Sequence, residues 1–204
     1  MAIQLNKVNQ YSAEDDTLKG KSKFWGFPDM PSHIDYPYKD EDPLCFLCQI
    51  NLEELHLKTN NHYTKQLPNK GMLYFFAQID YFLGWTDEMD NGIGSWNKES
   101  FKVIYTDDIS ELFTHKTYFE DQTPAALDAW SIDFVECQDN VHGHKLLGKP
   151  FFEEIPSKTS LLQIDEDDDW GLRFYDSGMI NFTIDEKSLQ IKDFDKVRFY
   201  FHSL

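Results

Sequence analysis

The sequence predicts an α+β, β-rich fold made mostly of antiparallel sheets, with an internal duplication and a few short helices. Short apolar and aromatic runs bounded by turn residues recur along the chain, as expected of strands. These runs outnumber the helical patterns and do not alternate regularly with them, which argues against a parallel doubly wound sheet. A length of 204 residues and a 16% content of Phe, Tyr and Trp are sufficient for a packed core without a disulfide or metal.

The N-terminal region is expected to lie outside the sheet. Residues 1–20 are polar and acidic, and we interpret them as a loosely held lead-in. Residues 21–38 carry Pro28, Pro31 and Pro37 among aromatic side chains. Because proline fixes φ and lacks a backbone donor, this stretch is predicted to be an ordered, irregular surface loop rather than a helix or a central strand.

The strand predictions rest on local composition. Residues 44–52 (LCFLCQINL) are almost entirely apolar, which is typical of a strand buried on both faces. Residues 71–85 follow the turn-like sequence LPNKG and are rich in aromatics. Residues 101–108 (FKVIYTDD) have the pattern of a half-exposed strand. Further strands are predicted within residues 161–165, 171–185 and 197–204.

The helical predictions are few. Residues 123–134 (TPAALDAWSIDF) predict a short helix that begins at Thr123-Pro124. Residues 108–113 (DISELF) are compatible with one helical turn capped by Asp108. Residues 188–197 are expected to form a loop or a single turn.

Two sequence elements occur twice in the same order. The motif Gln-Ile-Asn/Asp follows an apolar run at Gln49 and again at Gln163. The motif Gly-Met, followed by an apolar strand, begins at Gly71 and again at Gly178. Ordered self-similarity of this kind indicates duplication, and the two copies are expected to form related sheets or halves of one sheet, with a seam or cleft between them.

The charge balance limits the classes of partner. The chain has 36 acidic and 19 basic residues and a net charge of −17. Such a surface repels nucleic acid and anionic membranes, so we expect neither as a partner, whereas a basic protein remains compatible.

The sequence shows no signal peptide or membrane span, and three cysteines cannot form a fully paired disulfide framework. We therefore expect a cytoplasmic protein.

Seven ordered blocks stand out along the chain, namely SKFWGFPDMP with Tyr36-Pro37, PLCFLCQINLEEL, LPNKGMLYFFAQID, HKLLGKPFF, LLQIDEDD, DSGMINFTI and DFDKVRFYFHS. Together they resemble the YwqG-like family, a group of bacterial proteins classed as a domain of unknown function. The chain departs from the family pattern at Trp25, where a glycine is usual, and at Glu153 or Glu154, where a glutamine is usual. The resemblance implies a β-rich α+β domain with a duplicated core and carries no activity, substrate or catalytic residue.

The expected domain organisation follows from these blocks. Residues 1–20 form the acidic lead-in, and residues 21–204 form a single YwqG-like domain. Within that domain the repeat halves span about 43–108 and 145–204.

The sequence contains two patterns that resemble metal sites, and neither is favoured as one. Cys45-x-x-Cys48 has zinc spacing, and Cys137, His142 and His144 could complete a ligand set. On a strand, however, residues three apart point to opposite faces, and buried free cysteine is common. The acidic turn Asp165–Asp169 with Asp176 resembles a calcium loop, but Trp170 replaces the turn glycine and the flanking segments are predicted strands. We expect no bound metal and no cofactor.

No catalytic motif is present, so a binding function is favoured. The sequence has no GxSxG, HExxH, P-loop or GxGxxG. The leading hypothesis is a non-enzymatic binding or interaction protein, one concrete form of which is an immunity-like protein that neutralises a basic protein partner. The alternative is an enzyme of unrecognised type with a cleft between the repeat halves, lined by His144, Asp165 and Asp176. The candidate ligand or partner surface comprises Lys23, Trp25, Phe27, Tyr36, His144, Asp165 and Asp176, although for the aromatic residues we favour the interpretation that they cap one end of the core.

Overall fold

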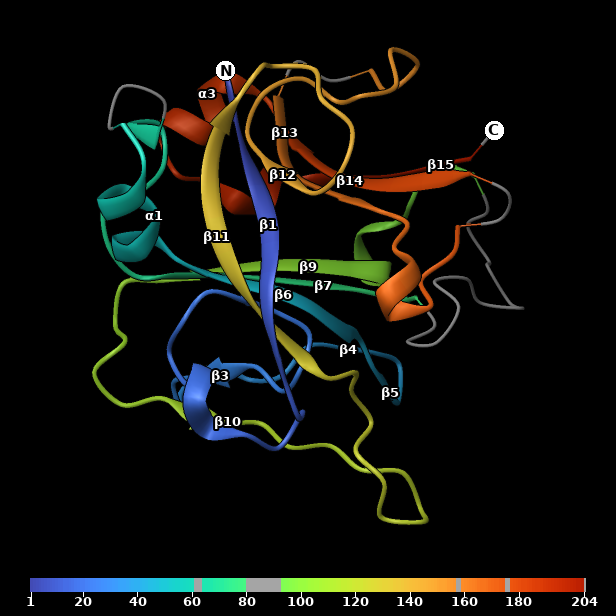
Figure 1. Cartoon of the computed structure of the whole chain (residues 1–204). Helices are drawn as coiled ribbons and strands as arrows, with labels where there is room; N and C mark the ends of the chain where they lie inside the picture. The colour runs from blue at the N-terminus through green and yellow to red at the C-terminus, as the bar shows by residue number, and fades with distance from the viewer. Residues whose placement is uncertain (61–63, 80–92, 157–158, 175–176, 204) are drawn as a thin grey trace.

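The computed structural model describes the chain except residues 61–63, 80–92, 157–158, 175–176 and 204 (Figure 1). Its helices are α1 (Leu52–Lys58) and α3 (Glu186–Gln190), with 3₁₀ turns η1 (Asp16–Leu18), η2 (Lys98–Ser100), η3 (Asp168–Trp170) and η4 (Phe194–Lys196). The main strands are β1 (Ala2–Tyr11), β6 (Cys45–Asn51), β7 (Met72–Ala77), β9 (Phe101–Thr106), β11 (Ala129–Cys137), β13 (Thr159–Asp165), β14 (Gly178–Ile184) and β15 (Arg198–Ser203). The short strands are β2 (Lys23–Phe24), β3 (Asp29–Met30), β4 (Tyr38–Lys39), β5 (Asp42–Pro43), β8 (Gly94–Ser95), β10 (Phe113–Thr114) and β12 (Lys145–Leu146).

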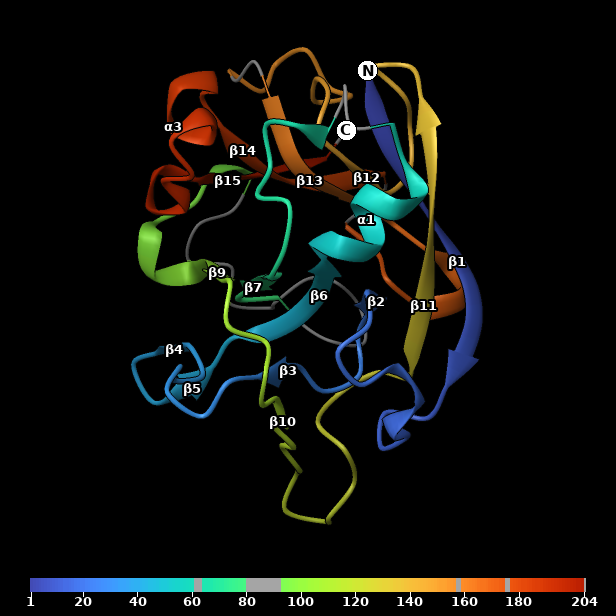
Figure 2. The same cartoon turned by 90° about the vertical axis from the view of Figure 1, so that its left-hand side faces the viewer.

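Eleven of these strands form one antiparallel sheet, in the order β8-β15-β14-β13-β12-β1-β11-β2-β6-β7-β9. The sheet curves so strongly that its two ends face each other, with the long β1–β11 pair forming the bend (Figures 1 and 2). The prediction of a β-rich α+β fold with antiparallel sheets and few helices is confirmed. Among the described residues, no helix is long and apolar enough to cross a membrane.

The sheet consists of two halves with the same strand arrangement. From β1 outward the order is β12, β13, β14 and β15, and from β11 outward it is β2, β6, β7 and β9. The pairing registers agree as well, because Lys23 lies opposite Gln49 and Lys145 lies opposite Gln163. The β6–β7 and β13–β14 pairs each contain a register shift at the residue two before that glutamine, Leu47 and Leu161. This agreement in order, register and bulge supports an internal duplication.

A further repeated element is visible only once the halves are aligned. The sequences SKFWGFP from Ser22 and HKLLGKP from His144 occupy equivalent places at β2 and β12. Each has two consecutive residues with positive φ, namely Trp25-Gly26 and Leu147-Gly148. The glycines are required by close packing as well, because a Cβ on Gly26 would lie 2.8 Å from the Ala129 Cβ.

Residues 1–20 are not a loosely held lead-in, and this expectation was wrong. Residues Ala2–Tyr11 form β1, which pairs with both β11 and β12 and therefore lies at the centre of the sheet. Ile3 and Leu5 are buried and alternate with Gln4 and Asn6, as a half-buried strand requires. The N-terminal strand thus completes the C-terminal half of the sheet.

The predicted helix at residues 123–134 was also wrong. Its second part lies in β11, where Trp130, Ile132 and Phe134 alternate with more polar residues. The helical turn expected at 108–113 is absent from the structure, which has bends there followed by β10. In contrast, the strands predicted from the apolar runs agree with β6, β7, β9, β13, β14 and β15, although residues 80–85 lie outside the described part of the chain.

The seam between the two halves is filled by side chains. We define the seam as the interface between the β6–β7–β9 strands and the β13–β14–β15 strands. Phe75 and Phe182 have ring centroids 5.3 Å apart, and Phe101 stacks on Phe199 at 5.6 Å. These rings belong to one continuous buried cluster. The centre of the seam is therefore hydrophobic core and not an open cleft.

Candidate functional site

In the first half, buried polar groups hold the irregular loop of residues 21–38 against the sheet. Asp29 is 1% exposed, and its Oδ2 accepts hydrogen bonds from Lys23 Nζ (2.8 Å) and Gln49 Nε2 (3.0 Å). Thr114 Oγ1 donates to its Oδ1, and Tyr74 donates to its carbonyl oxygen. Burial lowers the pKa of Lys23, and Asp29 opposes this shift. The loop is therefore part of the folded core.

The second half has an equivalent buried lysine and glutamine but, among the residues that the structure describes, no carboxylate between them. Gln163 Oε1 accepts from the Phe151 backbone N–H, as Gln49 Oε1 accepts from that of Asp29. Lys145 is 0% exposed, and its Nζ donates to the carbonyl oxygens of Asp139 (3.2 Å) and Lys149 (2.6 Å). Burial lowers its pKa to about 8, because desolvation disfavours the charged form.

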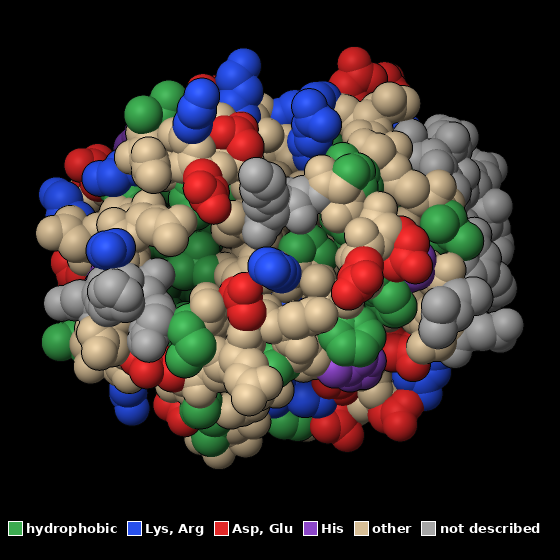
Figure 3. Space-filling model, turned by 90° about the horizontal axis from the view of Figure 1, so that it is seen from above, with side chains coloured by type: hydrophobic (Ala, Val, Ile, Leu, Met, Phe, Trp, Pro, Cys, Tyr) green, Lys and Arg blue, Asp and Glu red, His purple; other side chains and the backbone are tan. Residues whose placement is uncertain are grey.

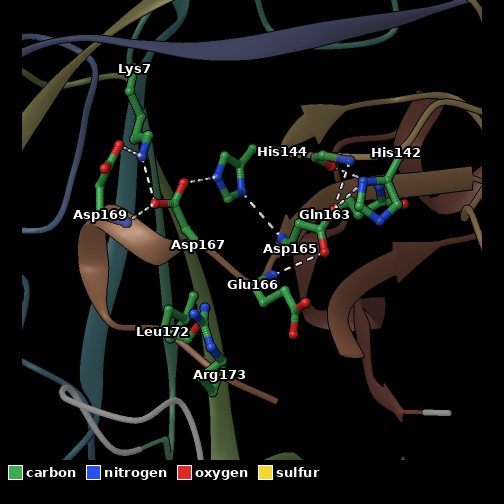
Figure 4. Close-up of polar contacts among 11 residues, drawn as sticks. Lys7, His142, His144, Gln163, Asp165, Glu166, Asp167, Asp169, Leu172 and Arg173 are labelled. Atoms are coloured by element: carbon green, nitrogen blue, oxygen red, sulfur yellow. Dashed lines mark hydrogen bonds and ion pairs between the residues drawn. The ribbon is translucent and has the colours of Figure 1, made fainter. Parts of the chain in front are cut away.

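A network of charged groups joins β1 to the turn after β13 (Figure 4). We call it the His–Asp cluster, comprising Lys7, His142, His144, Asp165 and Asp167. Lys7 Nζ contacts Asp167 Oδ1 at 2.5 Å, and His144 Nε2 contacts Asp167 Oδ2 at 3.1 Å. Burial raises the pKa of Asp167, but hydrogen bonds and charges from His144 and Lys7 outweigh this and lower it to about 2.

The two ring nitrogens of His144 are occupied by the protein itself. Its Nδ1 lies 3.2 Å from the backbone N–H of Asp165, which donates to it, so the ring proton lies on Nε2 and is donated to Asp167. The ring also stacks on Trp170, with centroids 4.6 Å apart. A histidine fixed in this way positions the turn after β13 and has no lone pair available for a substrate.

His142 and Asp165 form a second pair with a different exposure. Asp165 is buried, and its Oδ2 lies 2.9 Å from His142 Nδ1 and accepts from the Gly143 backbone N–H. The His142 side chain is 64% exposed. A buried carboxylate that orients an exposed imidazole is the arrangement of a general base, although the structure shows no nucleophile beside it in the described part of the chain.

The carboxylates of the acidic turn contact side chains of the protein itself. Asp165 contacts His142, Asp167 contacts Lys7 and His144, and Asp169 Oδ2 lies 2.7 Å from Lys7 Nζ. These are three of the positions that a calcium loop would use. Asp176, the fourth candidate ligand, lies outside the described residues.

The cysteines are separated in the fold. Cys45 and Cys48 are buried on β6, whereas Cys137 ends β11 opposite Ala2. His144 is bound to Asp167 as described above. Within the described residues, no group of three or more His, Cys, Asp or Glu side chains is arranged to hold a metal ion.

One end of the molecule combines exposed acidic and aromatic side chains. We call it the acidic end and define it as residues 12–20 and 107–128, which lie together at the bottom of Figure 1 around η1 and β10. It carries nine acidic residues, all exposed, against two lysines. Its exposed rings are Phe113 (51%), Tyr118 (42%) and Phe119 (41%).

The predicted aromatic contact surface is mostly buried. Trp25 and Phe27 are 0% and 1% exposed, and Lys23 is buried with Asp29, so these side chains cannot contact a partner from solvent. Tyr36 is half-buried and donates a hydrogen bond to the Leu44 carbonyl oxygen. The rings cap the core because the loop that carries them packs on the sheet.

Sequence reasoning missed Lys7 and the acidic end. Lys7 falls within the expected lead-in, although the alternation of Ile3 and Leu5 with polar residues indicates a strand on which it has a fixed place. At the acidic end, Tyr118-Phe119 is followed directly by Glu120-Asp121. Adjacent aromatic and acidic residues outside the predicted strands and helices were the available signal.

Comparison with known proteins gives one family. The family model described as "Domain of unknown function (DUF1963)" matches the chain over residues 22–142 and again over residues 114–202. The two matches overlap and together cover most of the chain, which is consistent with the duplicated sheet. No curated protein matches the chain.

Proposed function

The chain belongs to the DUF1963 family, a domain of unknown function, and we propose that it is a YwqG-like, non-enzymatic binding protein whose acidic end binds a basic protein. The observation that supports this most directly is the coincidence of nine exposed carboxylates with three exposed aromatic rings. Buried aromatics are normal in a core, whereas clustered exposed ones mark interaction sites.

The two kinds of side chain have complementary roles in such a contact. Carboxylates steer a basic partner toward the surface and accept hydrogen bonds from its Lys and Arg side chains. Aromatic rings supply apolar contact area and cation–π attraction at little entropic cost. Tyr118 is already held in place, because its hydroxyl donates to Glu14 and its ring contacts Phe27. A cytoplasmic, immunity-like protein that neutralises a basic toxin is the concrete form that we propose.

Affinity capture followed by a variant comparison tests this proposal. Immobilised full-length chain is used in moderate salt to isolate a partner, and the dissociation constant of the purified pair is then measured. Phe119→Ser is expected to weaken binding at least about tenfold. Leu57→Ser, at a residue 86% exposed on α1, is the matched control and should leave binding unchanged. Failure to recover a basic partner, or equal effects of the two variants, would contradict the proposal.

The alternative function is an enzyme that uses the His142–Asp165 pair. It is supported by the exposed imidazole beside a buried carboxylate, and not by a central cleft, because the seam is packed. A turnover screen that finds an activity lost in His142→Ala but kept in His33→Ala, at an exposed histidine elsewhere, would favour this alternative over binding.

A further inference from the structure

A pocket lies where the rim of the seam reaches the surface. Its volume is 660 Å³. One wall comes from the second half, through β14, α3, η4 and β15, and Lys98 of η2 comes from the segment that leads into β9 of the first half. Figure 2 shows α3 and β9 on the same side of the molecule, away from β10 at the lower end. The packed seam thus leaves a pocket at its edge.

The pocket gathers positive charge on an acidic protein. Lys98, Lys187, Lys196 and Arg198 line it, whereas the whole chain carries a net charge of −17. Among the described residues, Lys187, Lys196 and Arg198 form no ion pair. In the view from above, several Lys and Arg side chains lie along the upper edge of the picture, with Asp and Glu side chains among them (Figure 3).

The acidic residues of the pocket are largely engaged elsewhere. Asp185 caps α3 and accepts hydrogen bonds from the backbone N–H and the hydroxyl of Ser188. Asp195 faces Lys102, whose Nζ lies 3.7 Å from its Oδ1. The third acid of the lining is Glu186, at the exposed start of α3. The lining therefore has four basic residues against three acidic ones, and three of the basic side chains form no ion pair within the described residues.

Lys98 is an exposed lysine of the pocket that other lysines repel. Its Nζ donates to the Asp195 carbonyl oxygen and lies over the Phe101 ring, 5.6 Å from the centroid. Burial lowers its pKa, Asp195 and Asp193 oppose this shift, and the positive charges of Lys102 and Lys196 lower the pKa further. An anion placed among these groups would relieve that repulsion.

We propose that this pocket binds a small organic anion that carries a phosphate group. Arg198 offers the planar fork that binds two phosphate oxygens, and the lysines offer point charges. Pro156 and Ile184 line the same pocket and provide apolar contact for the organic part. The proposal is independent of the acidic end, because the two sites lie at opposite ends of the molecule.

Isothermal titration of the full-length chain with inorganic pyrophosphate tests the phosphate part directly. We expect saturable binding at one site, weakened about tenfold in Arg198→Gln and in Lys196→Gln, since each variant removes one charge-assisted contact. These side chains are exposed, and thermal melts establish that both variants fold. Lys116→Gln, an exposed lysine at the acidic end, is the matched control and should bind pyrophosphate normally.

Three results would overturn the proposal. They are the absence of saturable binding, an equal loss in Lys116→Gln, and equal affinity for sulfate, which would indicate only general anion attraction. Phe119→Ser is expected to bind pyrophosphate normally. A negative pyrophosphate result therefore does not contradict the proposed partner surface at the acidic end. A negative partner-binding result likewise does not contradict the proposed pocket.

Discussion

Lys23 and Lys145 occupy equivalent positions in the two halves, yet their surroundings differ. Lys23 donates to the Asp29 carboxylate, whereas the Lys145 ammonium donates to the Asp139 and Lys149 carbonyl oxygens. At the position equivalent to Asp29 the second half has Phe151, whose backbone N–H meets Gln163. Both halves therefore have the lysine and the glutamine, whereas the carboxylate partner of the lysine is present in the first half and, within the described residues, absent from the second.

The buried Lys145 predicts a stability change at high pH. Its pKa is about 8 in the folded chain, against 10.5 for a lysine side chain in water, so the unfolded state binds more protons between these values. The free energy of unfolding should therefore rise with pH over this range, by about 2–3 kcal/mol from this group. Lys145→Met should lose that rise, as measured by urea unfolding across the pH range. The exposed Lys149→Met is the control, and parallel curves for wild type and Lys145→Met would contradict the assignment.

Asp167 predicts a stability change of the same sign at low pH, because its pKa is also lower in the folded chain than in the unfolded chain. Its pKa is lowered from 3.8 to about 2 by His144 and Lys7, so its contribution is fully present above 3.8 and is lost as the pH falls through 2. Asp167→Asn should destabilise the chain at neutral pH by about 1–2 kcal/mol, allowing for partial solvent screening, and the difference should shrink on acidification. The control is Asp168→Asn, whose side chain is 85% exposed, and unfolding is followed by circular dichroism. A constant difference between wild type and Asp167→Asn at all pH values would contradict this interpretation.

At the scale of single residues, the sequence predicted types of side chain better than their partners. Gln49 and Gln163 stand out as repeated, but their role in holding backbone groups of a distant loop depends on contacts 20 and 12 residues away. Lys7 and Asp167 are 160 residues apart. Local pattern carries no information about such contacts, which depend on the order of strands in the sheet.

At the scale of elements, β1 lies at the centre of the sheet, although its polar composition did not predict a strand there. Its outer half is polar and exposed, while Ile3 and Leu5 are buried between the two halves of the sheet. Ile3→Asp should destabilise the chain by at least about 4 kcal/mol, because it buries an unpaired charge. Val8→Asp, at a residue 52% exposed on the same strand, should change stability by less than about 0.5 kcal/mol. Equal, small effects on the thermal midpoint would mean that β1 is not required for the fold.

The strands found from sequence and those missed differ in a physical way. β6, β7 and β14 are buried on both faces, so their composition alone identifies them. β11 is partly exposed along most of its length, and Thr123-Pro124-Ala125-Ala126 before it suggested a helix start. The two-residue strands β2 and β12 have no periodicity to detect, and only the repeated Lys-x-x-Gly-x-Pro sequence marks them.

At the scale of the whole molecule, the two halves exchange strands. β1, from the beginning of the chain, pairs with β12 in the second half, and β11, from beyond its middle, pairs with β2 in the first half. Each half-sheet is therefore completed by a strand on the far side of the loop that follows β10. That loop is exposed at Glu120, Asp121 and Gln122 and projects from the lower end of the molecule (Figure 1).

This exchange predicts that a chain cut at residues 120–122 stays folded as a pair of fragments and that neither fragment folds alone. The N-terminal fragment would lack β11 and the C-terminal fragment would lack β1, so each would expose a long unpaired edge beside a hydrophobic core. A protease site inserted at Gln122 allows the test, because exposed loop tips tolerate insertion and cleavage. The cleaved protein should elute as one species in gel filtration and should keep its circular dichroism spectrum. Denatured and separated fragments should regain that spectrum only when mixed. A C-terminal fragment that folds alone would show instead that β1 is dispensable for the second half, in contradiction to the exchanged arrangement.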